Sequence, residues 1–439
     1  MLLRFAAENI MSFKDAVEFN TFPSSKSHSH DWHKVVCKHA TVLRMTAIYG
    51  ANGAGKSNLL KCVSLLRAMV MVEKLGDIQI SDDLHFKLDR EGYSRPSELA
   101  VEFFTGDRVF YYHVVFNGMK ILEEDLSISG KSKDTPIFTR KDNNIEVSTE
   151  FFTSGGNEKS ADVFLDAISR VIRPDMLALS FFGRYYPDEL PIVKTAFDWF
   201  PQLQVIAPSM TAEALPYLLE KDAEFASLVN EIVPELNTGI SSLRVNSIVI
   251  NEGDVKDNAP LRAMYNAAKA NPGKPQTVDL FTIIMENGVV MLKSLMAVHV
   301  NSDGKEIGLN IREESDGTRR LVEYMPLLYS ILRKGGVFVI DEIERSIHPI
   351  MIKSIMRKIS ESRDAQGQII FTTHESCLLD QNIFRPDEIW FAQKDVNQST
   401  QLYPLSDYNI HKTANIENGY LNGRYGGIPF LSNLSDLKW

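Results

Sequence analysis

One segment, Gly50-Ala51-Asn52-Gly53-Ala54-Gly55-Lys56-Ser57, constrains the fold of this chain more than any other feature. It fits the phosphate-binding loop pattern, in which a glycine-rich stretch ends in a Lys-Ser pair. An apolar run of strand length, Val42 to Tyr49, precedes it, and a helical pattern from Ser57 to about Glu73 follows. Strand, loop and helix in this order predict an α/β fold with a phosphate site at the start of the helix.

The residue types of this loop suit a triphosphate with Mg²⁺. Glycines let the backbone wrap closely around phosphate, and the amides at the helix start point towards its negative oxygens. We expect Lys56 to hold the β- and γ-phosphates and Ser57 to offer its hydroxyl to Mg²⁺. A plain glycine-rich turn before a helix is the alternative. The predicted ligands are therefore ATP and Mg²⁺, bound by Asn52, Gly53, Ala54, Gly55, Lys56, Ser57 and Asn58.

Polar side chains follow two later apolar strands. Asp341 and Glu342 come directly after the strand Val337 to Ile340, and His374 follows the strand Ile369 to Thr373. Ligands of open α/β sheets bind at the carboxyl ends of the strands. Asp341 therefore suits Mg²⁺, Glu342 suits a base that positions the attacking water, and His374 could polarise the γ-phosphate. Taken singly, each residue would also fit a solvated or structural strand end.

A further segment, Glu314 to Arg320, opens a helix just before the carboxylate strand. Its Ser315-Asp316-Gly317 core places a hydroxyl and free backbone amides at a positive helix end, which suits a γ-phosphate approaching from outside. A plain capped helix is the alternative, since Ser315 or Asp316 would serve as the cap. Lys56 and Asp341 lie 285 positions apart. This separation predicts a large insertion between the two motifs.

The order of these motifs resembles that of ABC, SMC and Rad50-like ATPases. The chain is most similar to the stand-alone ABC-like ATPases of phage-exclusion and abortive-infection modules, relatives of the overcoming-lysogenisation-defect ATPases. The similarity runs nearly end to end and rests on the segments ENIMSFKD, GANGAGKSN, ESDGTRRL, VIDEIERSIHP, IIFTTHE and YLNGRYGGIPF.

This resemblance implies ATP hydrolysis in a head-to-tail homodimer. Ser315 and Gly317 of one copy would contact ATP held by the loop of the other, and His348 with Ser346 would act across the same interface. Gln79 is the candidate for a glutamine-loop residue. About 65 residues follow His374, too few for the nuclease domain of the related nucleases. The resemblance therefore implies a separate effector, a neighbouring nuclease or toxin.

These patterns predict an α/β chain built on an ABC-type nucleotide-binding domain, with antiparallel N-terminal strands and a parallel phosphate-loop core. We expect residues 1–135 to form its first half, 136–272 an inserted, mainly helical lobe, and 273–439 its second half with the signature, carboxylate and histidine motifs. Helix-period segments between prolines predict the lobe. The heptads that a long coiled coil would need are missing from the sequence.

Composition limits the partners and the compartment. A net charge of −10 argues against a basic nucleic-acid-binding coat, although a local patch leaves nucleic acid open as a partner. No apolar run is long enough for a membrane span, and Arg4 and Glu8 interrupt any secretory signal, so we expect a cytoplasmic protein. Cys37, Cys62 and Cys377 fit reduced, buried thiols.

A histidine-rich stretch raises the question of zinc. Its candidate ligands follow no paired spacing and are interleaved with Ser, Lys and Asp, so a polar surface loop is favoured. The candidates are His28, His30, His33, Cys37 and His39.

Two functional hypotheses follow. In the first, ATP closes a dimer, or a higher assembly, of a defence ATPase and thereby controls the separate effector. In the second, the chain is a DNA-repair or chromosome-organising clamp that binds DNA directly, which predicts salt-dependent, ATP-stimulated DNA binding. A transporter ATPase fits less well, because it should have a glutamine loop and a compact insert.

Overall fold

The computed structural model describes residues 1–78, 84–152, 168, 170–208, 214–278, 280–408, 410 and 414–428. The chain divides into two compact units. The first unit comprises residues 1–207, 335–343 and 356–439, and the second comprises residues 208–334 and 344–355. The chain therefore leaves the first unit twice, first for residues 208–334, which build most of the second unit, and again for residues 344–355.

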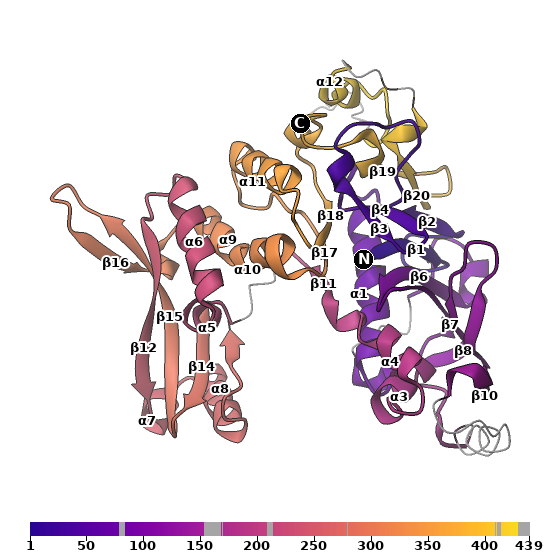
Figure 1. Cartoon of the computed structure of the whole chain (residues 1–439), viewed down its shortest axis with the longest axis horizontal. Coiled ribbons are helices and arrows are strands. Elements are labelled where there is room, and N and C mark those ends of the chain that lie inside the picture. The colour runs from indigo at the N-terminus through magenta and orange to yellow at the C-terminus, as the bar shows by residue number, and fades with distance from the viewer. Residues whose placement is uncertain are drawn as a thin grey trace, which may run out of the picture. The chain divides into compact units, whose positions relative to one another are not determined.

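A mainly parallel sheet of the first unit carries the motif strands (Figure 1). Its order is β11-β17-β18-β5-β19-β20, and within it only the β19/β20 pair described here is antiparallel. Every residue of β5, β17 and β18 is buried, as expected for parallel strands covered on both faces. The strands are β5 (Met45–Gly50), β11 (Leu203–Ile206), β17 (Val337–Ile340), β18 (Gln368–Thr372), β19 (Ile389–Lys394) and β20 (Thr400–Pro404).

An antiparallel sheet forms the second layer of this unit. Its described order is β10-β9-β8-β7-β6-β1-β2. The antiparallel N-terminal strands that the sequence predicted are present, since β1 pairs with β2 and β6 pairs with β7 in antiparallel fashion. The strands are β1 (Leu2–Glu8), β2 (Val17–Asn20), β6 (Ser97–Thr105), β7 (Arg108–Asn117), β8 (Lys120–Ile128), β9 (Thr135–Lys141) and β10 (Asn144–Val147), and a separate hairpin pairs β3 (Lys34–Cys37) with β4 (Ala40–Leu43).

One hydrophobic core joins the two sheets of the first unit. Phe103 of β6, Leu66 of helix α1 and Val339 of β17 belong to the same buried cluster, and the Trp199 ring stacks on Phe103 with centroids 4.2 Å apart. The amphipathic α1 thus lies between the sheets. The helices that contribute residues to this unit are α1 (Lys56–Met71), α3 (Ala178–Tyr185), α4 (Pro191–Phe197), α11 (Pro349–Glu361) and α12 (Ile416–Leu421).

The second unit is built on an antiparallel sheet of order β12-β15-β14-β13, with β16 also paired to β15. Tyr265 and Ala268 of α8 share a core with Ile283 of β14 and Val290 of β15. Its strands are β12 (Ser242–Ile250), β13 (Gln276–Val278), β14 (Phe281–Glu286), β15 (Val289–Val300) and β16 (Glu306–Asn310). Among the described helices it holds α5 (Leu215–Lys221), α6 (Ala223–Glu235), α7 (Glu252–Val255), α8 (Ala259–Ala270), α9 (Asp316–Glu323), α10 (Met325–Tyr329) and the first part of α11, residues 349–355.

This division differs from the boundaries expected at 135/136 and 272/273. Residues 136–207 belong to the first unit, because β9 and β10 extend its antiparallel sheet and β11 joins its parallel sheet. Residues 273–334 belong to the second unit, which is a sheet with helices rather than a mainly helical lobe. The longest described helix, α1, has 16 residues, so the described chain shows no long coiled-coil arm.

The sequence predicts reduced, buried cysteines and no apolar run long enough to span a membrane. All three cysteines are free thiols; Cys37 and Cys62 are buried as expected, whereas Cys377 is half-buried. Burial raises the pKa of the Cys37 and Cys62 thiols, which keeps them protonated and unreactive. None of the helices within the described ranges is both long and apolar enough to cross a membrane.

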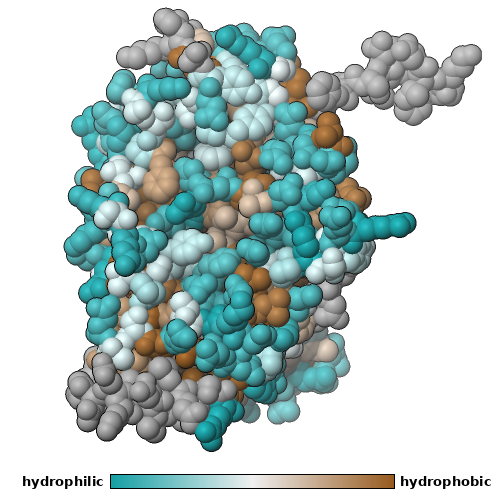
Figure 2. Space-filling view, turned by 90° about the vertical axis from the view of Figure 1, so that its right-hand side faces the viewer, coloured by the Kyte–Doolittle hydropathy of each residue, from teal (hydrophilic) through white to brown (hydrophobic). Residues whose placement is uncertain are grey.

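The surface of the first unit that Figure 2 presents is mainly hydrophilic. Hydrophobic atoms appear there as small, separate spots rather than as one continuous patch. Scattered apolar residues of this kind are normal for a surface in contact with water. The described residues on this face therefore present no large apolar area in Figure 2.

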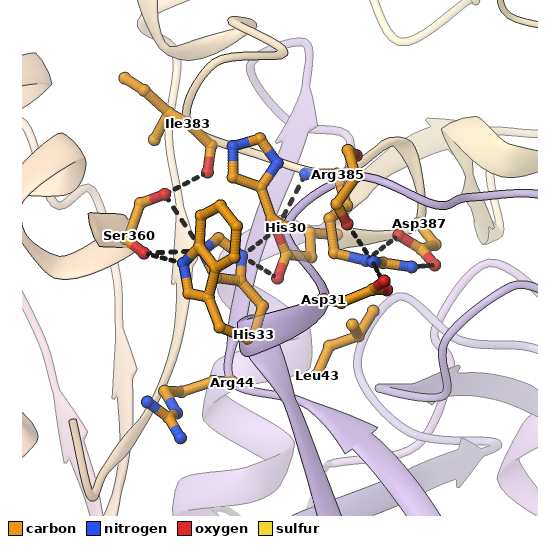
Figure 3. A network of polar contacts seen from close by, with 12 residues as sticks. His30, Asp31, His33, Leu43, Arg44, Ser360, Ile383, Arg385 and Asp387 are labelled. Atoms are coloured by element: carbon orange, nitrogen blue, oxygen red, sulfur yellow. Dashed lines mark hydrogen bonds and ion pairs between the residues drawn. The ribbon is translucent and has the colours of Figure 1, made fainter. Parts of the chain in front are cut away.

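A buried polar network ties the histidine-rich stretch to residues 360–388 (Figure 3). His33 is only 2% exposed; its Nδ1 lies 2.9 Å from Glu388 Oε1 and its Nε2 lies 2.9 Å from the Ser360 carbonyl oxygen. Arg385 is fully buried and holds Asp387 through two hydrogen bonds of 2.9 and 2.8 Å. These contacts join two segments that are distant in sequence.

The surface-loop interpretation of this stretch needs a correction at His33 and Cys37, because both are buried. His28 is exposed, and His30 and His39 are half-buried. The described His, Cys, Asp and Glu side chains contain no group of three that could hold a metal ion. The imidazole of His33 therefore serves as a hydrogen-bonding link in the described network.

Replacing His33 with alanine should destabilise the first unit. Burial raises the pKa of Glu388, and the hydrogen bond from His33 opposes that rise. Without His33 the buried carboxyl loses this partner, so we expect the free energy of unfolding to fall by about 3 kcal/mol. Urea unfolding followed by tryptophan fluorescence would measure the loss. Lys34→Ala, which removes an exposed pair with Asp31, is the control, and equal midpoints for the two variants would contradict the prediction.

Candidate nucleotide-binding site

The glycine-rich segment connects β5 to α1. β5 ends at Gly50 and α1 begins at Lys56, so residues 51–55 form the loop. Gly53 (φ 79°) and Gly55 (φ 105°) adopt left-handed backbone conformations that residues with a Cβ rarely take. A Cβ at Gly55 would also collide with the Thr400 hydroxyl, whereas the space beside Gly53 is open. Glycine is therefore required at both positions, and at Gly55 for two reasons.

Lys56 lies inside this loop rather than on the surface. It is 5% exposed, and its ammonium donates hydrogen bonds to the carbonyl oxygens of Gly50 (2.8 Å) and Ala51 (3.3 Å). The first turn of α1 contains no acidic residue, so nothing in that turn offsets the positive end of the helix. Asn52 and Gly53 are exposed at the tip of the loop. Together these features give a loop with a positively polarised backbone at the start of α1, which suits phosphate.

The sheet brings Ser57 and Asp341 together, as the sequence predicted. Ser57 Oγ donates to Asp341 Oδ1 over 3.1 Å, although 284 positions separate the two residues. Asp341 follows β17, and β18 lies between β17 and β5, so both residues reach the same edge of the sheet. Hydroxyl and carboxylate oxygens are ligands that Mg²⁺ prefers. The pair therefore fits Mg²⁺.

Thr372, the last residue of β18, organises this edge and was missed by the sequence interpretation. Its hydroxyl donates to Asp341 Oδ1 over 2.5 Å and accepts from the Glu342 backbone amide over 2.8 Å. One side chain thus fixes the position of both carboxylate-bearing residues. The sequence position of Thr372 could have indicated this role. It directly precedes the predicted strand end at Thr373 and His374, where a polar residue lies at the same edge of the sheet.

Glu342 has a strained backbone. Its φ of 50° is unusual for a residue with a side chain, and its side chain is half-buried. Conformations of this kind persist where surrounding contacts enforce them, and they cluster at functional sites. The bond from its amide to Thr372 is one such contact. Glu342 thus follows Asp341 directly, two residues past the end of β17.

His374 is exposed and lies two residues beyond the end of β18. The neighbouring Thr373 amide donates to the Ile48 carbonyl of β5 over 3.1 Å, which fixes the start of this segment beside the phosphate-loop strand. The backbone of His374 therefore follows the strand that lies between β5 and β17. This is the position that the sequence order predicted.

Ser315 and Gly317 belong to the second unit, at the start of α9. Ser315 is the helix cap, since its Oγ accepts from the Thr318 amide over 3.1 Å. A Cβ at Gly317 would lie 2.6 Å from the Ser346 carbonyl oxygen, so this glycine permits a close backbone approach within the unit. The capped helix is thus present, and contact with the nucleotide of a second copy stays a prediction.

His348 and Gln79 complete the predicted set. His348 is exposed in the second unit, and its Nδ1 accepts from the Ile350 amide over 3.3 Å at the start of α11. Its predicted contact across a dimer stays a prediction. Gln79 lies outside the residues that the structure describes.

Comparison with known families gives one match over most of the chain. The model of the family described as "AAA domain, putative AbiEii toxin, Type IV TA system" matches residues 45–380 of the 439. The matched stretch begins with β5 and ends beyond His374, so it contains every predicted site residue. A search of curated proteins finds no match.

Among solved structures, three heads of SMC proteins are similar. An SMC head bound to the C-terminal winged-helix domain of ScpA has a TM-score of 0.43 and 14% identity over 92% of this chain and 97% of that one. The SMC head domain from Thermotoga maritima has a TM-score of 0.37 and 12% identity, over 93% of this chain and 99% of that one. The third is an SMC head domain with an extended coiled coil, bound to the C-terminal domain of ScpA derived from Pyrococcus furiosus. It has a TM-score of 0.40 and 14% identity, over 92% of this chain and 96% of that one. The strand order and pairing of the chain itself place it in the predicted α/β class.

Proposed function

Because the chain belongs to the AAA domain family described as a putative AbiEii toxin of type IV toxin–antitoxin systems, we propose that it is a Mg²⁺-dependent ATPase of an abortive-infection module. One observation carries this proposal. Ser57 and Asp341 meet at 3.1 Å beside a glycine-rich loop whose backbone is shaped for phosphate. A structural glycine turn would not need a hydroxyl and a carboxylate gathered at its edge.

Each site residue has a distinct task in this proposal. Lys56 and the amides of the loop bind the β- and γ-phosphates, and Asn52 to Asn58 surround them. Ser57 and Asp341 would hold Mg²⁺, which would neutralise phosphate charge when bound. Glu342 accepts a proton from the attacking water, and His374 contacts the γ-phosphate from the adjacent strand end.

The second half of the site comes from another copy of the chain. Ser315 and Gly317 open a helix whose first turn offers amides to the γ-phosphate, and His348 lies in the same unit. Binding of ATP would then join two copies into a homodimer or a higher assembly. Closure or turnover of that assembly would control a separate cytoplasmic effector, a nuclease or toxin. The family description supports the link to abortive infection.

Two variants should separate ATP binding from ATP hydrolysis. Glu342→Gln should retain ATP affinity and slow turnover by about 100-fold or more, because it removes the base but not the phosphate contacts. Lys56→Ala should weaken ATP binding by about tenfold or more. Equilibrium binding and steady-state phosphate release would measure both. Unchanged turnover in Glu342→Gln would remove this residue from the mechanism.

A mixing experiment tests whether the site is shared between copies. Ser315→Asp keeps a good helix cap but places a carboxylate where the γ-phosphate is expected, so turnover should fall at least tenfold. Ser315→Asn, a neutral cap, is the matched control. An equal mixture of Ser315→Asp and Lys56→Ala should regain about a quarter of the wild-type rate, because half of the exchanged dimers hold one intact site. A mixture no faster than its components would contradict the shared site.

A further inference from the structure

Three side chains from outside the phosphate loop gather on its outer side. Thr400, at the start of β20, is fully buried, and Ser12, in the segment between β1 and β2, is 7% exposed. Lys394, the last residue of β19, is half-buried. Gly55 lies against Thr400 and Ser12 so closely that a Cβ there would meet both hydroxyls. Thr400 and Ser12 therefore lie directly against the loop, and Lys394 reaches it through Thr400.

The hydroxyl of Thr400 is the centre of this arrangement. Its Oγ1 lies 2.9 Å from the Ala54 carbonyl oxygen, 2.8 Å from Ser12 Oγ and 3.1 Å from Lys394 Nζ. A hydroxyl has one hydrogen and two lone pairs. A carbonyl can only accept and an ammonium can only donate, so all three contacts are satisfied when Thr400 donates to Ala54 and accepts from Lys394 and Ser12. The Thr400 amide also donates to the Ser12 carbonyl oxygen over 2.8 Å.

The bond to Ala54 determines which way the next amide points. In a planar trans peptide the carbonyl oxygen and the following N–H point in opposite directions. Holding the Ala54 oxygen towards Thr400 therefore directs the Gly55 N–H away from it. In the proposed site this amide is one of the loop donors available to phosphate. Thr400 thus acts on the ligand only through the loop backbone.

Lys394 contributes charge as well as a hydrogen bond. Its ammonium lies 3.1 Å from Thr400 Oγ1, and burial lowers its pKa, as expected for a cation partly removed from water. By donating to Thr400 it occupies one lone pair and leaves the hydroxyl hydrogen for Ala54. A cation at this place also adds to the positive potential of the loop.

We propose that Ser12, Lys394 and Thr400 form a brace that positions the Ala54–Gly55 peptide for phosphate binding. This inference rests on the proposed nucleotide site and assigns the three as positioning residues. The brace supports the part of the loop that surrounds the β-phosphate, which ATP and ADP share. Its loss should therefore weaken both nucleotides equally and raise KM, with little change in kcat.

The test compares Thr400→Val, which keeps the shape but loses the hydroxyl, with Thr400→Ser, which keeps the hydroxyl. Thr400→Val should weaken ATP and ADP binding alike by about tenfold, with kcat within about twofold of wild type. Thr400→Ser should restore most of the affinity. Binding of both nucleotides is measured by titration, and thermal unfolding is recorded for each variant.

Two outcomes would overturn the brace. Wild-type affinity in Thr400→Val would mean that the hydroxyl does not position the loop, and equal losses in Thr400→Val and Thr400→Ser would assign the effect to packing. If Thr400→Val does not fold, Ser12→Ala decides, with a loss of about threefold expected for both nucleotides and unchanged affinity as the contrary result. Failure of the wild-type protein to bind either nucleotide would instead contradict the proposed function.

Discussion

The hydrogen bonds that Asp341 accepts from Ser57 and Thr372 are the contacts on which the rest of the site depends. They exist because β18 lies between β5 and β17, so that three neighbouring parallel strands end at one edge. The chain between Ser57 and Asp341 builds most of a second unit before it returns to complete this edge. The sheet order therefore converts a large separation in sequence into a distance of a few ångströms.

The loop itself is held from two sides. On the inner side, Lys56 bonds to the carbonyl oxygens of Gly50 and Ala51, and on the outer side Thr400 bonds to that of Ala54. Gly55 can take its left-handed conformation because it has no Cβ to strike Thr400. Fixing the backbone before a ligand arrives reduces the ordering that binding would otherwise require. A preorganised loop is what an anion site built from backbone amides needs.

Local patterns predicted the elements that carry their own signal. The phosphate loop, the β1/β2 hairpin, the buried strand β17 and the exact neighbourhood of His374 all follow from apolar runs and glycines that are close in sequence. The strand β12 was missed, because Arg244, Asn246 and Ser247 interrupt its apolar residues on a sheet that is only partly buried. The boundaries at 136 and 272 failed for a related reason. Which unit a strand joins is decided by pairing with distant partners such as β11 with β17.

Contacts between distant residues were likewise not predictable. Thr372 could have been suspected from its place at a strand end, but no pattern links Thr400 to a loop that lies near the other end of the chain. His33 had the sequence appearance of a surface histidine, and only Glu388 and Ser360 explain its burial. Hydrogen bonds between side chains that are distant in sequence produce no periodic pattern in the sequence.

If Ser57 and Asp341 hold Mg²⁺ against a bound triphosphate, the affinity for ATP must depend on Mg²⁺ through Asp341. ATP binding should be measured with Mg²⁺ and with a chelator, for the wild-type protein and for Asp341→Asn. Mg²⁺ should tighten ATP binding to the wild type, and Asp341→Asn should lose this gain. The same gain from Mg²⁺ in both proteins would contradict this role of Asp341.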